Sequence, residues 1–166
     1  MQKAPSLSFF WKLIIAIVIC ELTGVMSSFL SMTHMYPWFS QLQKPSWNPP
    51  ASIFAPVWTT LYLMMGISLA LVWKTEKQSD NQKEKLSAML IFASQLFLNF
   101  WWSIAFFRFH SPPLAFGIIV MMLLLILITI LKFSPFSKVA SWLLIPYISW
   151  VSFATVLNYT IWQMNV

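Results

Sequence analysis

Apolar residues gather in five long runs along this chain, separated by short segments that are polar or contain proline. The runs cover residues 11–31, 53–73, 86–107, 114–131 and 139–162. A helix needs about 20 mostly apolar residues to cross the hydrocarbon core of a bilayer, and each run is close to that length. The pattern therefore predicts an all-α integral membrane protein, in which residues 1–166 form a single domain built as a five-transmembrane-helix bundle.

Most of the segments between these runs are short, which favours antiparallel neighbours in a compact bundle. The longest unbroken connection is 32–52, where Lys44-Pro45 and Pro49-Pro50 fix the backbone and remove donors. We expect residues 37–50 to be stiff and irregular, and the loop 32–52 to cover a pocket at one end of the bundle. Pro146 lies inside the last run and predicts a kink near 143–146.

Composition supports the membrane class, because 59% of the residues are hydrophobic and 8% are charged, against about 25% charged in ordinary globular chains. With three glycines, a glycine-rich phosphate loop is not expected, and Cys20 has no second cysteine with which to form a disulfide. The net charge of +6 does not indicate nucleic acid, since the basic residues lie between apolar runs. Orientation in the membrane explains them better.

The basic residues divide unequally between the two sides of the predicted bundle. Lys44 and Arg108 fall on one side. The opposite side carries Lys3, Lys12, Lys74, Lys77, Lys83, Lys85, Lys132 and Lys138. Because cytoplasmic segments are enriched in lysine and arginine, we expect a cytoplasmic N-terminus and an extracytoplasmic loop 32–52 in a multi-pass protein of the cell membrane.

Polar and aromatic residues recur on one face of three predicted helices. The repeating residues are Phe54, Trp58 and Tyr62; Gln95, Asn99, Trp102 and Phe106; and Tyr147, Trp150, Ala154 and Asn158. Polar groups inside a bilayer face protein or a cavity, so we expect the three faces to converge. The amides alone could serve to hold the helices together. The deep tryptophans favour a pocket for a flat ligand, because lipid-facing tryptophans belong at the membrane interfaces.

Other candidate chemistry is sparse. Glu21 is an acid inside a predicted span, and two interpretations stay open: a proton relay or cation site, or a carboxyl paired with a hydroxyl or backbone group. His34 and His110 lack neighbouring metal-ligand residues, so no metal site is expected. The sequence shows no spacing typical of a hydrolytic triad or a carboxylate pair.

Three motifs resemble one known family. They are W-F-x-x-L-x-K-P-x-W-x-P-P at 38–50 continuing as F-x-P-V-W-x-x-L-Y-x-M-M-G to residue 66, Q-L-F-L-N-F-W-W-S at 95–103, and P-Y-I-S-W-V-S-F-A-T-V-L-N at 146–158. This series resembles the translocator protein family, whose bacterial members are called tryptophan-rich sensory proteins. The chain departs from the family at Phe39, where a tyrosine is usual. It also lacks a basic residue soon after Tyr159, so the family's cholesterol motif is incomplete.

The resemblance implies a five-helix bundle, commonly a homodimer, with a pocket beneath the loop between the first two helices. It implies as pocket wall Trp47, Pro49, Trp58, Asn99, Trp102, Trp150, Ala154 and Asn158. To these we add Trp38, Phe54 and Tyr62 from the residue pattern itself. The family binds porphyrins such as protoporphyrin IX and synthetic benzodiazepine-type or isoquinoline ligands, with no cofactor required.

Three functions are therefore considered. The first is a membrane receptor for porphyrins that acts in their sensing, transport or scavenging, with the lipid bilayer and a second copy of the chain as partners. The second is a light-dependent, metal-free enzyme that degrades porphyrin, with Trp58 and Trp150 as its catalytic residues. The third is a regulatory membrane partner that has no small-molecule ligand.

Overall fold

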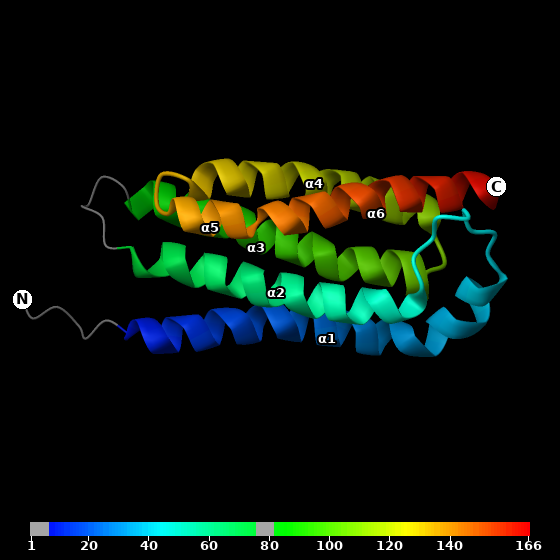
Figure 1. The fold of residues 1–166 in the computed structure, drawn as a ribbon, viewed down its shortest axis with the longest axis horizontal. Helices are drawn as coiled ribbons and strands as arrows, with labels where there is room; N and C mark the ends of the chain where they lie inside the picture. The colour runs from blue at the N-terminus through cyan, green and yellow to red at the C-terminus, as the bar shows by residue number, and fades with distance from the viewer. Residues whose placement is uncertain (1–6, 76–81) are drawn as a thin grey trace, which may run out of the picture.

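The computed structural model describes residues 7–75 and 82–166, without the side chains of residues 33–37. Lys3, Lys77 and the side chain of His34 lie outside the described residues. Long helices run alongside one another, parallel to the longest axis of the molecule (Figure 1). In chain order the elements are α1 (Phe9–Gln41), α2 (Ala51–Lys74), α3 (Gln82–Ser103), the π-helix η2 (Ile104–Arg108), α4 (Pro112–Phe133), α5 (Lys138–Leu143) and α6 (Ile145–Met164).

The described residues contain five stretches of helix that are long and apolar enough to span a membrane, which confirms the predicted fold class. The fifth of them combines α5 and α6. The two helices meet at Leu144, just before Pro146, whose backbone nitrogen carries no hydrogen to donate to the preceding turn. The kink expected near 143–146 is therefore confirmed. Exposed apolar side chains such as Phe29, Leu131 and Trp142 cover the outer surface, as a bilayer requires.

The prediction of a loop over residues 32–52 is wrong for the first half of that segment. Helix α1 continues as far as Gln41 and includes Pro37, so the irregular connection is limited to residues 42–50. A proline removes one backbone hydrogen bond and bends a helix, but the turns on either side can stay helical. Figure 1 shows the result, because the last turns of α1 bend away from the axis of the rest of the helix.

The short connection 42–50 is held against the end of α6. The side chain of Asn165 accepts a hydrogen bond from the backbone N–H of Gln43 and donates one to its carbonyl, both at 2.9 Å. Lys44 lies with its ammonium 4.5 Å from the ring centre of Phe39. Trp47 packs edge-to-face on Phe153, with ring centres 5.9 Å apart. These contacts bring the connection and α6 together at one end of the bundle.

Helices α1 and α2 pack closely because glycine faces the neighbouring helix at two points. Gly24 of α1 lies against the ring of Tyr62, and Gly66 of α2 lies against the backbone of Ile17. A side chain at either position would meet these atoms, so the close approach depends on the missing Cβ. This packing fixes the height of Tyr62 within the bundle.

Candidate functional site

A chain of buried hydrogen bonds links three helices in the interior. The Tyr62 hydroxyl on α2 donates to Asn99 Oδ1 on α3, and Asn99 Nδ2 donates to the Tyr147 hydroxyl on α6 over 3.1 Å. Tyr147 in turn donates to Gln95 Oε1 over 2.8 Å. All four side chains are buried. We call this set the amide–phenol chain; it joins the three predicted faces, which therefore converge as expected.

The amide–phenol chain runs in one direction and ends on an unsatisfied donor. Gln95 is 1% exposed, and its Nε2 has no hydrogen-bond partner among the described residues. The indole nitrogen of Trp150 is a second buried donor that has no hydrogen-bond partner among the described residues. A buried donor without an acceptor costs about 1–3 kcal/mol, so both positions hold polar groups that the rest of the fold does not satisfy.

Trp58 lies against this chain and against a second tryptophan. Its ring is stacked on Tyr62 with centres 5.6 Å apart, and it meets Tyr147 edge-to-face at 6.4 Å. The ring of Trp102 lies 6.2 Å away, tilted by 35°. Trp58 is half-buried and makes no hydrogen bond with the described residues. Three aromatic rings therefore lie around Trp58.

Trp102 is fixed by its indole N–H, which donates to Asn158 Oδ1 over 3.1 Å. Asn158 in turn donates through Nδ2 to the carbonyl of Pro112, over 2.9 Å. Pro112 is the first residue of α4, so this pair of bonds ties three helices together and holds the Trp102 ring at one angle. Asn158, one of the three amides on the predicted faces, thus makes structural hydrogen bonds to two neighbouring helices.

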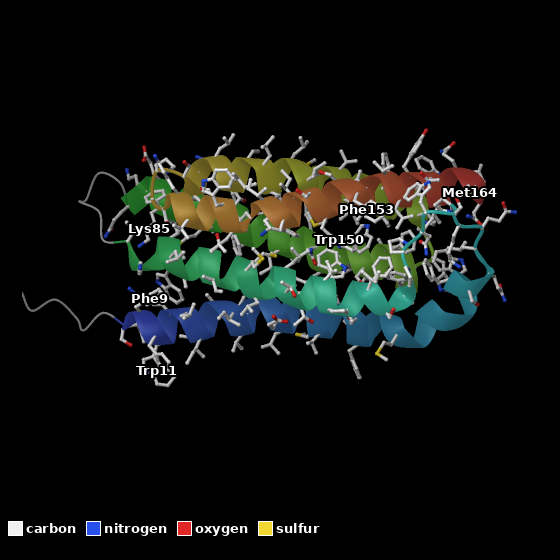
Figure 2. The ribbon with its side chains drawn as sticks, in the orientation of Figure 1. Phe9, Trp11, Lys85, Trp150, Phe153 and Met164 are labelled. Atoms are coloured by element: carbon white, nitrogen blue, oxygen red, sulfur yellow. The ribbon has the colours of Figure 1, made fainter. Side chains whose placement is uncertain are left out.

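A row of aromatic rings extends from the connection 42–50 along α6. Trp47 contacts Phe153, Phe153 lies 5.5 Å from Trp150, and Trp150 meets Phe54 edge-to-face at 5.9 Å. Figure 2 shows Trp150 reaching from α6 toward α2. Beside this row an open groove of about 620 Å³ runs between the two helices. Its walls are Pro56, Val57, Thr60, Leu61, Pro146, Ser149, Trp150 and Phe153.

The residues predicted to line one pocket divide into two groups with two outliers. Trp58, Tyr62, Asn99, Trp102 and Asn158 meet in the interior, and Ala154 belongs to the same core. Trp47, Phe54 and Trp150 belong to the aromatic row.

The outliers are Trp38 and Pro49. Trp38 stacks on the imidazole of His110 at 4.6 Å and meets the buried Phe106 edge-to-face at 5.6 Å. Pro49 accepts a hydrogen bond from Asn48. His110 has a positive φ of 51°, unusual for a residue other than glycine, and directly follows the turn that closes η2.

Three residues were not selected from the sequence as site residues. Gln95 and Tyr147 stand on the predicted polar faces, and the i, i+4 spacing to Asn99 was the signal for Gln95. Phe153 lies three residues after Trp150, the spacing that places two rings on one side of a helix. Glu21 is half-buried, and the hydroxyl or backbone partner considered above is not found among the described residues.

The fold and this interior define a class: a polytopic helical membrane protein whose core is aromatic and internally hydrogen-bonded. Residues 16–163 match the TspO/MBR family, and the chain belongs to that family. It is 42% identical to the tryptophan-rich protein TspO of Chlorobaculum tepidum over 92% of this chain and 95% of that protein. It is 34% identical to the tryptophan-rich protein TspO of Archaeoglobus fulgidus, over 93% and 97%. The translocator protein of Ovis aries is 37% identical over 78% and 76%.

Proposed function

We propose that this protein binds a flat, hydrophobic ligand of the porphyrin type inside the bundle, against Trp58 and Trp102. The observation that supports this proposal is the set of aromatic rings around Trp58. They are the rings of Tyr62, Trp102 and Tyr147, which come from α2, α3 and α6. Aromatic faces favour offset stacking on a flat π-system, and a mostly apolar site with a few fixed polar groups is typical of small-molecule binding. Benzodiazepine-type and isoquinoline compounds likewise present aromatic rings and a few polar acceptors to such a site.

Two positively charged side chains, at the end of the bundle that carries the connection 42–50, support an anionic ligand. Lys44 lies in the connection that packs on α6, and Arg108 ends η2, where it donates to the carbonyl of Leu30 over 3.1 Å. Porphyrins carry propionate groups, which lysine and arginine attract when the rest of the ring is in an apolar environment. Sensing, transport and scavenging all require this binding step.

Replacing Trp58 with leucine tests the proposal. In a dark titration of the protein with protoporphyrin IX, followed by tryptophan fluorescence, wild-type protein is expected to show saturable quenching. Trp58→Leu removes a stacking surface and is expected to raise Kd about tenfold, which corresponds to about 1.4 kcal/mol. Trp142→Leu is the matched control, because Trp142 is 72% exposed on the outer surface, and its Kd should equal that of wild type.

Two results would count against binding at Trp58. Equal Kd values for the Trp58 and Trp142 variants would move the site elsewhere. The absence of saturation in wild-type protein would favour the third function, a membrane partner without a small-molecule ligand.

Light-driven degradation of the porphyrin is a second candidate, favoured by the oxidisable rings around Trp58. An excited porphyrin can take one electron from Trp58, which gives a porphyrin radical anion and a tryptophan radical cation. Tyr62 and Trp102 are close enough to reduce that cation in turn. Trp150 has its ring contacts in the aromatic row instead. The same samples under illumination distinguish this enzyme from a receptor, because the enzyme would bleach the porphyrin absorption band faster than free porphyrin bleaches under the same light.

We also propose that the N-terminus is cytoplasmic and that the connection 42–50 is extracytoplasmic. Figure 1 shows that α1, α3 and α5 begin at the end of the bundle where α2 and α4 finish. The described basic residues at that end are Lys12, Lys74, Lys83, Lys85, Lys132 and Lys138. Lys44 and Arg108 lie at the opposite end, and the excess of positive charge marks the cytoplasmic side.

A further inference from the structure

A second groove, of about 370 Å³, runs between α1 and α3. Its walls include Ile19, Thr23 and Met26 of α1 and Ala93, Leu96 and Phe97 of α3. Met26 is 54% exposed and Phe97 is 61% exposed, so the groove opens on the outer surface of the bundle. Both helices qualify as membrane spans. In a bilayer this opening therefore faces lipid chains.

The walls of this groove leave no polar group without a partner. Thr23 is the one polar side chain among the described residues that line it. The Thr23 hydroxyl donates to the carbonyl of Ile19 over 2.9 Å, within the same helix. A hydrocarbon chain gains dispersion contacts on such a wall and needs no hydrogen bond. The lining therefore suits an acyl chain better than a polar ligand.

Lys12 lies on the face of α1 that lines the groove. It precedes Ile19 by seven residues and Thr23 by eleven, and both spacings return to the same side of a helix. At a rise of 1.5 Å per residue, Lys12 is about 10 Å from Ile19 along the helix axis and about 21 Å from Met26. Lys12 is half-buried, and its ammonium has no acidic partner among the described residues. A positive charge thus lies beyond one end of an apolar groove.

The surroundings of Lys12 favour an anion. Lys85 of α3 donates through its ammonium to the carbonyls of Trp73 and Thr75, over 2.7 and 2.8 Å. These carbonyls lie at the C-terminus of α2, which carries a partial negative charge, and Lys85 offsets that charge. Figure 1 shows that α1 and α3 begin at the end of the bundle where α2 finishes. Among the described residues this end holds six lysines and one acid, Glu84.

The distance between Lys12 and the groove fits the dimensions of a phospholipid. A bilayer is about 40–45 Å thick with its headgroups, so the phosphates lie about 20 Å from the midplane. With a phosphate at the level of Lys12, the groove covers the depth from about 10 to about 21 Å below it. The inner half of an acyl chain lies at that depth. One lipid can therefore reach both the charge and the groove.

We propose that α1 and α3 together bind an anionic glycerophospholipid, with its phosphate at Lys12 and one acyl chain in the groove from Ile19 to Met26. Charge complementarity selects the headgroup, because basic residues between membrane spans attract anionic lipids. The apolar walls hold the chain. This lipid site is separate from the interior around Trp58, so the proposal does not depend on porphyrin binding.

Two pairs of variants separate a lipid site from general attraction to the membrane. Ala93 and Ser94 are exposed neighbours on α3, and Ala93 lines the groove whereas Ser94 does not. Ala93→Phe fills the groove, and Ser94→Phe places the same ring against lipid outside it. Lys12→Gln removes the charge beside the groove. Lys132→Gln removes a charge from the last turn of α4, at the same end of the bundle. Equal thermal midpoints within each pair would show that the variants fold alike.

The experiment is native mass spectrometry of the full chain, released from nanodiscs that contain equal amounts of phosphatidylglycerol and phosphatidylcholine. Wild-type protein is expected to retain phosphatidylglycerol in preference. Ala93→Phe is expected to lose most of this retained lipid, while Ser94→Phe retains it like wild type. Lys12→Gln is expected to lower the ratio of phosphatidylglycerol to phosphatidylcholine about fivefold, the effect of one lysine near a membrane surface. Lys132→Gln should keep the wild-type ratio.

Each other outcome overturns the proposal. Equal retention of the two lipids by wild type would mean that the groove has no preference for an anionic headgroup. If Ala93→Phe retains phosphatidylglycerol like wild type, the lipid is held elsewhere. If Lys132→Gln lowers the ratio as much as Lys12→Gln, the whole lysine-rich end attracts anionic lipid without a site at the groove. The same spectra give the number of chains, and loss of a dimer in Ala93→Phe with unchanged lipid would assign the groove to a second copy of the chain.

Discussion

Replacing Gly66 with leucine is expected to lower the free energy of unfolding by about 3 kcal/mol, at the upper end of the usual range for overpacked interiors. A Cβ on Gly66 would lie 2.6 Å from the Cα of Ile17, and a backbone atom cannot move away as a flexible side chain can. Helices α1 and α2 would have to separate along their length. The measurement is the thermal midpoint in detergent, followed by far-ultraviolet circular dichroism.

Gly117 provides the control for this prediction. It is exposed on α4, and no atom lies within 4 Å of a Cβ built on it. Gly117→Leu makes the same chemical change on the lipid-facing surface, so its midpoint should equal or exceed that of wild type. If both variants melt at the wild-type temperature, α1 and α2 are not in close contact at Gly66.

Asn99→Leu is expected to cost about 2 kcal/mol, because it leaves the buried Tyr62 hydroxyl without its acceptor. Tyr147 loses a donor at the same time but keeps its bond to Gln95. Removing both partners of a buried hydrogen bond is much less costly than removing one. The double variant Tyr62→Phe/Asn99→Leu is therefore expected to recover more than half of the loss.

A double-mutant cycle on thermal or denaturant unfolding measures this recovery. The single variant Tyr62→Phe completes the cycle, and the coupling energy follows from the four free energies of unfolding. Additive effects of the two substitutions would contradict the bond between Tyr62 and Asn99. The loss would then come from changes in packing alone.

The spans and the polar faces could be predicted from the sequence because each rests on local spacing. Hydrophobic runs place the helices within a few residues, apart from the end of α1, and the 3.6-residue period places Gln95 and Asn99 on the same face of α3. Amides buried in a bilayer then find their partners mainly on neighbouring helices, and here those partners are tyrosine and tryptophan side chains. The break at Leu144 also followed from a local cause, the missing donor of Pro146.

Other features depend on how helices meet in space, which spacing does not reveal. Whether Pro37 ends a helix or bends it depends on the packing of the turns that follow, and here α1 continues to Gln41. Trp38 therefore lies between His110 and the buried Phe106 and makes no ring contact with Trp58 among the described residues. The division of the predicted pocket residues into an interior group and an aromatic row also depends on how the helices pack against one another. Trp150 faces the groove at α2 while Trp58 faces α3 and α6.

Circular dichroism of protoporphyrin IX in its visible absorption band tests the central claim most directly. The porphyrin is achiral, so it gives a signal only when a chiral environment holds it in one orientation. With the protein in nanodiscs, we expect a band that grows with added porphyrin, saturates, and is reduced in Trp58→Leu but not in Trp142→Leu. A signal no larger than that of empty nanodiscs would contradict an ordered binding site in the bundle.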